Sequence, residues 1–209
     1  MKLNALIVTA HPFTHSFNLA LSAQAEQQLR QAGWHVEVSN LYQQGFSPIA
    51  GALDVGERHL LEGANLLQLQ AEAVKQNRLA DDILTEQAKL NSADLIILQF
   101  PIWWGTMPAM LKGWLERVFS YGYAYGEQYA LEGKALMMSV TTGGARDDEE
   151  RQYYDDKLQD LANETFGYMK MRCLPAFICH GPASSSQDER VAELKRFGDT
   201  LDTLIATLD

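Results

Sequence analysis

The segment QFPIWWGTMPAMLKGWLERVF, residues 99–119, links an apolar run to a helical pattern. Residues 93–100, which lead into it, are apolar at nearly every position, and this is typical of a strand buried on both faces of a sheet. After the turn, apolar residues recur three and four positions apart, as they do on one face of a helix. Two adjacent tryptophans, Trp103 and Trp104, occupy the turn itself. A buried strand that leads directly into a helix predicts one unit of a parallel α/β sheet.

The same alternation extends over most of the chain. Four more apolar segments predict four more strands, at residues 3–10, 34–40, 134–141 and 172–180. Further helical patterns cover residues 17–32, 82–90 and 191–208. Long, helix-bearing connections require parallel strands. We therefore expect a single α/β domain over residues 1–209, with a five-stranded parallel sheet and helices on both faces.

Residues 41–90 depart from this alternation, because they hold a polar, Gln-rich stretch with little strand pattern. We expect an extended excursion after the second strand, ending in the helix at 82–90. Such an excursion is either an arm for a partner or a plain surface loop, and the sequence leaves both readings open.

Composition excludes some classes of function. The net charge of −10 argues against binding to nucleic acid or to an anionic membrane, since both require clustered basic side chains. The only two cysteines, Cys173 and Cys179, are expected on one face of one strand, about 20 Å apart and too distant for a disulfide. The first apolar run is too short for a signal peptide or a membrane span. These features predict a cytoplasmic protein.

Ligands of open parallel sheets bind beyond the carboxyl ends of the strands. The segments expected there are residues 11–18, residues from 41 onward, 101–107, 141–144 and 180–186. The first segment places Thr14, Ser16 and Asn18 at the start of a helix, where hydroxyls and free backbone amides suit a phosphate. A serine before a helix is, alternatively, an ordinary N-cap. His11 and His15 are weak signals for a metal, because no third ligand stands nearby.

The remaining loops suit a flat ligand. Trp103 and Trp104 could form an aromatic wall at the crevice, although either ring could instead cap the core. The tetrapeptide at 141–144, Thr-Thr-Gly-Gly, offers hydroxyls and close backbone approach, or is simply a tight turn. Motifs of dinucleotide-binding folds, P-loops and nucleophile elbows are absent from the sequence.

Taken together, these segments resemble the flavodoxin-like NAD(P)H:quinone oxidoreductases of the DT-diaphorase type. The resemblance rests on residues 5–18, 33–42, 46–49, 99–119, 123–125 and 141–144, and it covers about the first 145 residues. It implies a flavodoxin-like fold, a tightly bound flavin, and a homodimer that transfers hydride from NAD(P)H to quinones in a ping-pong reaction. The excursion is as long as in the FAD-binding members, which favours FAD over FMN and places residues 41–90 at the dimer contact and the FAD adenine.

The resemblance also implies specific site residues. Those implied to bind the cofactor are His11, Ser16, Phe17, Asn18, Pro101, Ile102, Trp103, Trp104, Thr141, Thr142, Gly143, Gly144, Arg190 and Leu194. Tyr123, Tyr125 and Trp104 are implied at the substrate, with Tyr125 supplied by the partner subunit.

One position departs from the family pattern. Members of the family carry a tyrosine and a histidine shortly after the Thr-Thr-Gly-Gly turn, whereas here an acidic run follows, with Tyr153 and Tyr154 inside it and no histidine. We expect one of these tyrosines to turn inward as the catalytic phenol. Gly105 and Thr106 replace an aromatic-Gly pair, which predicts a more open pocket.

Three other functions stay compatible with parts of the pattern. Relatives of this type also act as regulatory ancillary subunits of potassium-efflux systems, which would require a membrane-protein partner. A preference for azo or nitro compounds would use the same chemistry. A one-electron carrier of the short flavodoxin kind fits less well, because the excursion and the tyrosine-rich segment at 119–133 exceed what a carrier needs.

Overall fold

The computed structural model describes residues 3–57, 63–145 and 147–208. Within them, every strand pairs in parallel with its neighbours in the order β2-β1-β3-β4, and the last position is shared by β5 and β6. The strands are β1 (Asn4–Thr9), β2 (His35–Asn40), β3 (Leu95–Pro101), β4 (Ala135–Thr142), β5 (Arg172–Cys173) and β6 (Phe177–His180). The predicted parallel sheet with helices on both faces is confirmed.

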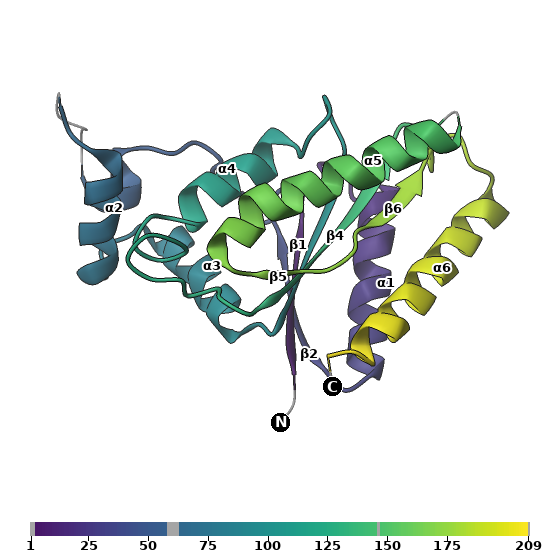
Figure 1. Ribbon diagram of the computed structural model, residues 1–209, viewed down its shortest axis with the longest axis horizontal. Coiled ribbons are helices and arrows are strands. Elements are labelled where there is room, and N and C mark those ends of the chain that lie inside the picture. Colours follow the sequence, from purple (N-terminus) through teal and green to yellow (C-terminus); the bar gives the residue numbers. More distant parts are fainter. Residues whose placement is uncertain (1–2, 58–62, 146, 209) are drawn as a thin grey trace.

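Helices cover the two faces unequally (Figure 1). One face lies against α1 (Phe17–Gln31) and α6 (Gln187–Ile205), and the other against α3 (Asp81–Ser92), α4 (Ala109–Val118) and α5 (Asp148–Leu161). Successive strand residues point into the two cores alternately. Ile7 packs with α1 and α6, whereas Leu6 and Val8 pack on the opposite side. Because both sides are buried, the strands read as continuous apolar runs.

The fifth strand is split, which the sequence did not predict. Leu136 of β4 pairs with Cys173, but Ser139 pairs with Phe177, so three residues of the outer strand span the same length as two of β4. Pro175, which has no backbone N–H to donate, lies inside this insertion. An extra residue reverses the side-chain alternation.

The insertion also corrects the placement of the cysteines. Cys173 contacts the core beneath α4 and α5, whereas Cys179 lies in the core beneath α1 and α6. The prediction that they share a face was therefore wrong. Both are free thiols, as their separation predicts.

The excursion holds more helix than the sequence suggested. It contains a short 3-10 turn at Ala52–Val55, helix α2 (Leu66–Lys75) and then α3; residues 58–62 of the predicted excursion lie outside the described residues. Helix α2 fully buries only two small residues, Ala71 and Ala73, whereas Leu66 and Leu67 are exposed and Leu69 and Val74 are partly buried.

Two close contacts fix the excursion to α4. Arg117 is 5% exposed and donates to Asp54 at 2.8 and 3.0 Å, to Asp82 at 3.0 Å, and to the Ser47 carbonyl at 2.7 Å. Gly113 sits where any Cβ would lie 2.0 Å from the Pro48 carbonyl oxygen. The buried guanidinium and the missing side chain together hold the backbone of the excursion against the helix.

The acidic run after the Thr-Thr-Gly-Gly turn forms the first half of α5, which the sequence did not predict. Asp147 caps the helix by accepting from the Glu150 N–H at 2.9 Å, and acidic residues occupy the first turn, where the helix dipole favours them. The helix is largely polar and buries only Leu158, so its apolar pattern is weak.

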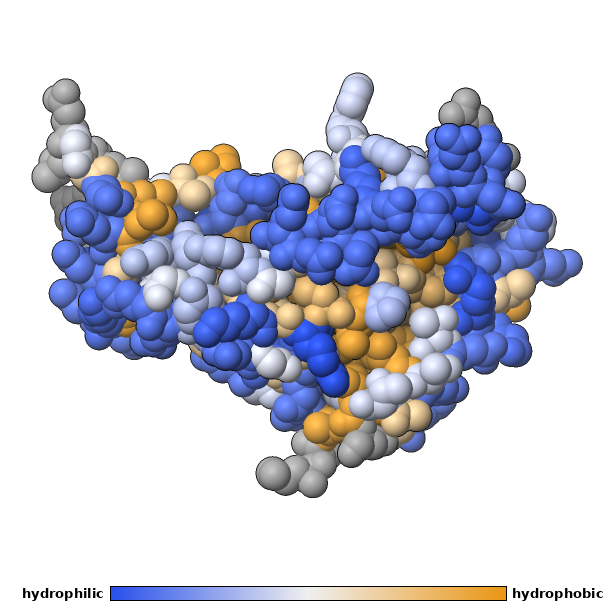
Figure 2. All heavy atoms as spheres, in the orientation of Figure 1, coloured by the Kyte–Doolittle hydropathy of each residue, from blue (hydrophilic) through white to orange (hydrophobic). Residues whose placement is uncertain are grey.

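The outer edge of the sheet stays partly open. Figure 2 shows the hydrophilic surface of α5 above an apolar strip that extends toward α6. Leu174, Pro175 and Ala176, from the split strand, line a hollow of about 270 Å³ there. No helix within the described part of the chain combines the length and apolarity that crossing a membrane requires.

The Arg117 contacts predict a large stability effect. Replacing Arg117 with Met should lower the free energy of unfolding by about 3 kcal/mol, because two carboxylates lose their buried cation. Urea denaturation measures the change. The matched control is Lys195→Met, which removes an exposed pair with Asp199 and should cost less than about 0.5 kcal/mol. Equal losses in the two variants would contradict this account.

Candidate functional site

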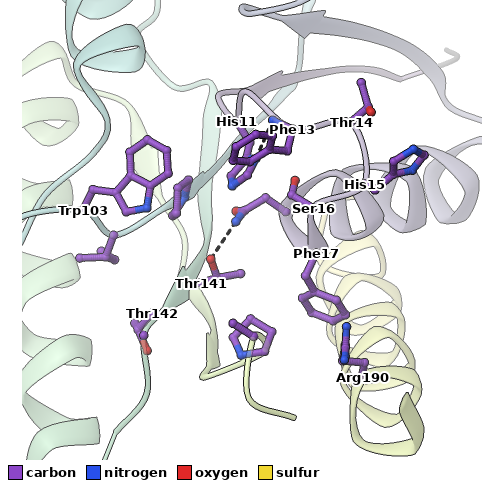
Figure 3. A pocket seen from close by; sticks show the side chains of 16 residues that line it. His11, Phe13, Thr14, His15, Ser16, Phe17, Trp103, Thr141, Thr142 and Arg190 are labelled. Atoms are coloured by element: carbon purple, nitrogen blue, oxygen red, sulfur yellow. Dashed lines mark hydrogen bonds between the residues drawn. The ribbon is translucent and has the colours of Figure 1, made fainter. Parts of the chain in front are cut away.

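The order of the strands reverses between β1 and β3, because the chain first moves outward to β2 and then returns to the other side of β1. A cavity of about 690 Å³ opens beyond the carboxyl ends of β1, β3 and β4 (Figure 3). Four of the five expected segments contribute to it; the loop after β2 does not, since β2 is the outermost strand on that side. The predicted cofactor residues that line the cavity are His11, Ser16, Phe17, Asn18, Pro101, Ile102, Trp103, Thr141, Thr142, Gly143 and Arg190.

His11 is oriented as a hydrogen-bond donor toward the cavity. Its Nδ1 accepts from the Phe13 N–H at 3.1 Å, so in the neutral ring the proton resides on Nε2. Burial lowers the pKa of His11, which favours that neutral form. The ring centroid lies 5.7 Å from that of Trp103, so the two rings form one wall (Figure 3).

The start of α1 supplies more donors. Ser16 caps the helix by accepting from the Leu19 N–H at 3.3 Å, as the N-cap reading predicts, and its own O–H remains available to a ligand. The next two backbone N–H groups, of Phe17 and Asn18, occupy the first turn, where a helix has no internal acceptors for them. Arg190 lines the same end of the cavity and is held by two bonds to the Ser185 carbonyl at 3.0 and 3.2 Å. This end suits an anion such as a phosphate.

The structure separates the two tryptophans. Trp103 and Thr106 exchange backbone hydrogen bonds at 2.9 and 3.0 Å, which closes a two-residue turn with Trp104 (φ 49°) and Gly105 (φ 75°) at its tip. Trp103 lines the cavity and is 39% exposed, whereas Trp104 projects fully into solvent at 103%. A left-handed conformation is unfavourable for a bulky residue, so this turn holds Trp104 outward at a cost.

A histidine that the sequence reading missed lies beside the Thr-Thr-Gly-Gly turn. His180, the last residue of β6, is the register partner of Thr142, and its Nδ1 lies 3.0 Å from the Thr142 Oγ1. The Tyr154 ring lies 5.7 Å from the His180 ring and packs on the core, while Tyr153 is 55% exposed. A tyrosine and a histidine therefore do meet here, but the histidine comes from the edge strand. The sequence feature that could have identified His180 is its position at the carboxyl end of a predicted strand.

Tyr153 has a different partner. The Lys157 Nζ, one helical turn further along α5, donates to its hydroxyl at 3.2 Å. A Cβ on Gly105 would lie 3.3 Å from this Nζ, so α5 reaches the turn that carries the tryptophans. In the first turn of α5, Asp148 and Glu149 are exposed to solvent.

Besides Trp104, Tyr153 and Tyr154, four further predicted residues lie outside the cavity wall. Tyr123 is 5% exposed and donates to the Asn91 side chain at 2.9 Å, so its hydroxyl is used inside the chain; burial raises its pKa. Tyr125 packs against Tyr121 and Tyr168 in a separate hollow beside α4. Leu194 packs into the core beneath α1 and α6. Gly144 closes the turn at φ 150°.

The cavity combines an anion-binding end with a flat, aromatic and backbone-lined end. Its volume lies within the range of roughly 300–1,000 Å³ found for cofactor and small-molecule sites. The donors suit a phosphate, and Trp103 with residues 141–143 suits a planar ring that carries acceptor atoms. A flavin nucleotide has both parts. Among residues 3–57, 63–145 and 147–208, no three His, Cys, Asp or Glu side chains lie together as metal ligands.

Comparisons with known proteins agree with this arrangement. The family described as Flavodoxin-like fold matches residues 3–201. Human ribosyldihydronicotinamide dehydrogenase [quinone] is 34% identical over 212 residues, which cover 95% of this chain and 90% of that protein. Guinea pig (Cavia porcellus) NAD(P)H dehydrogenase [quinone] 1 is 42% identical over 149 residues, which cover 68% of this chain but only 54% of the longer relative. A solved Klebsiella pneumoniae structure superposes with a TM-score of 0.86 at 31% identity, covering 97% of this chain and 85% of its own.

The surroundings of His180 predict how it titrates. Burial lowers its pKa below 6.5, and the positive charge of Arg151 lowers it further. As pH falls, the unfolded chain therefore binds a proton at this histidine at a higher pH than the folded chain does. The stability that neutral His180 contributes is present above pH 6.5 and is lost as pH falls through the folded-state pKa. NMR titration should give a midpoint below 6.5 that rises in Arg151→Gln. Lys112→Met, a charge change on α4, is the control; an unshifted midpoint in Arg151→Gln would contradict the assignment.

Proposed function

The chain belongs to the Flavodoxin-like fold family, and from that premise we propose that it is a flavin-dependent NAD(P)H:quinone oxidoreductase. One observation carries the proposal: a single cavity at the reversal of the strand order has phosphate donors at one end and an aromatic wall at the other. Relatives whose names include quinone dehydrogenase activity match this chain over 68–95% of its length, which supports the same reading.

We assign each part of the cofactor to residues that line the cavity. His11, Ser16 and the first amides of α1 would hold the phosphate, and Trp103 with residues 141–143 would hold the ring. When bound, the flavin supplies the hydride chemistry, accepting from the nicotinamide and delivering to the quinone. The chain itself orients the ring, excludes water from one face and directs donors at the ring edge.

We infer that Tyr154 and His180 stabilise negative charge at the edge of the flavin ring. His180 contacts the hydroxyl of Thr142, which lines the cavity, and the Tyr154 ring packs on His180. We infer that this pair, with Tyr153 at the outer rim, serves the catalytic role expected of the tyrosines. The lowered pKa of His180 favours the neutral ring, which can accept a proton, and the 3.0 Å contact between its Nδ1 and the Thr142 hydroxyl links it to the cavity wall.

The position of Tyr125 supports the proposal of a homodimer. Within one chain this side chain lies in a hollow beside α4, outside the cavity. It can reach the substrate side of a site only in a second copy of the chain, whose cavity it would cover together with the exposed Trp104. We propose that the protein is a homodimer in the cytoplasm, with no membrane-protein partner needed for quinone reduction.

The finer identity of the cofactor and donor is also a proposal. FAD rather than FMN is favoured by Arg190, which extends the donor set away from the ring and could meet a second phosphate or an adenine, with Leu194 further along the same helix. The relative matched nearly end to end is named for ribosyldihydronicotinamide, so a nicotinamide donor without the adenylate part is the second candidate.

The proposed activity predicts a coloured protein with a measurable donor preference. Purified protein should show the visible absorbance of an oxidised flavin, release FAD on denaturation, and reduce a soluble quinone with steady turnover. NADH, NADPH and dihydronicotinamide riboside are compared as donors under the same conditions. A protein that stays colourless after incubation with FAD and FMN would refute the proposal, and turnover with only the riboside would select the second candidate.

The two tryptophans should act on different ligands. Trp103→Ala should raise the flavin dissociation constant by at least about fivefold, since a planar ring stacked on an aromatic side chain is worth roughly 1–3 kcal/mol. Trp104→Ala, from the same turn, should leave flavin affinity near that of the wild type and raise the KM for quinone instead. Fluorescence titration and steady-state kinetics measure the two quantities. The reverse pattern would show that Trp104 folds back onto the flavin.

A further inference from the structure

Three polar side chains cross the middle of the sheet where apolar ones would be expected. Thr9, Gln99 and Ser139 are register partners on β1, β3 and β4, they face the α1 side, and each is at most 1% exposed. Within the described residues, Thr9 Oγ1, Gln99 Oε1 and Ser139 Oγ have no hydrogen-bond partner. Unpaired buried oxygens are costly, so the row needs a reason beyond packing.

Gln99 connects this row to the cavity through one intermediate. Its Nε2 donates to the Asn18 Oδ1 at 2.9 Å, and the Asn18 Nδ2 donates to the Thr141 Oγ1 at 2.8 Å. The second bond is the dashed line that ends on Thr141 in Figure 3. Asn18 and Thr141 line the cavity, whereas Gln99 is fully buried beneath them. The chain of bonds therefore begins in the core and ends at the cavity wall.

We propose that Gln99 is a positioning residue, which through Asn18 keeps the Thr141 hydroxyl a hydrogen-bond donor to the flavin. The inference rests on the proposed function. An amide has one donor side and one acceptor side, so the direction of each bond sets the direction of the next. Because the Thr141 Oγ1 accepts from Asn18, its hydrogen is free to turn into the cavity.

The direction matters because the opposite one would place a lone pair against the ligand. If Asn18 were flipped, its oxygen would take the Thr141 hydrogen, and Thr141 would then present only an acceptor. Flavin phosphate oxygens and most polar ring-edge atoms only accept hydrogen bonds, and a second acceptor repels them. Thr142, the next residue, also lines the cavity, but its hydroxyl donates to the Gly144 carbonyl at 3.2 Å and contacts His180, so it cannot substitute.

A double-mutant cycle tests the connection. Gln99→Met, Thr141→Val and the double variant are prepared without flavin, and folding is checked by circular dichroism and thermal unfolding. Dissociation constants for FMN and FAD are then measured by quenching of flavin fluorescence. The control is Ser139→Ala, a change in the same buried row at a hydroxyl that makes no hydrogen bond to Asn18 or Thr141.

Gln99→Met and Thr141→Val should each weaken flavin binding at least fivefold. The double variant should bind flavin only slightly more weakly than Thr141→Val alone, because the hydroxyl that Gln99 positions is already absent. Ser139→Ala should bind like the wild type. Additive losses at two residues that do not touch, or a wild-type affinity for Gln99→Met, would overturn the proposal. A wild type that binds neither flavin would instead defeat the proposed function.

A second variant covers the case in which Gln99→Met does not fold. In Gln99→Glu the protonated carboxyl can donate to Asn18 like the amide, whereas the carboxylate can only accept. Its flavin affinity relative to the wild type should therefore fall as pH rises, and the fall should disappear when Thr141→Val is added. A pH dependence identical to that of the wild type, or one that persists without the hydroxyl, would overturn the proposal.

Discussion

The reversal of strand order between β1 and β3 is the constraint on which the site depends. Neighbouring parallel strands with connections on opposite sides leave their carboxyl ends uncovered at one place. The loops after β1 and β3 diverge there. The start of α1 and the turn that carries the tryptophans therefore lie on opposite sides of the cavity. The excursion, held to α4 by Arg117 and Gly113, lies away from this place and leaves it open.

The elements that the sequence predicts well are those buried on both sides. Strands at 93–100 and 134–141 and the helices beginning near residues 17 and 107 carry strong apolar patterns, and four of the five expected loops meet at the cavity. Helices α2 and α5 escaped notice because they bury few large side chains. The pairing of Tyr154 with His180 was beyond a sequence reading, since their contact depends on how β6 lies against α5.

Two adjacent residues at the end of β4 make hydrogen bonds on opposite faces of the sheet. Thr141 faces α1 and is bonded by Asn18, whereas Thr142 faces α5 and is bonded by His180. The cavity is therefore supported from both cores at a single dipeptide. Similarity to quinone dehydrogenases extends over this region and beyond, so the comparisons and the geometry concern the same residues.

The extra residue in the outer strand is taken up locally, so the strand beyond it stays in register with β4. Side chains alternate along β6, and Ile178 and His180 face α5. Shortening the segment Leu174-Pro175-Ala176 by one residue would leave two residues opposite Met137 and Met138, so Phe177 would keep its pairing with Ser139 and His180 its place beside Thr142. A one-residue deletion at this edge in a homologous chain would therefore regularise the strand and preserve the imidazole beside the same threonine.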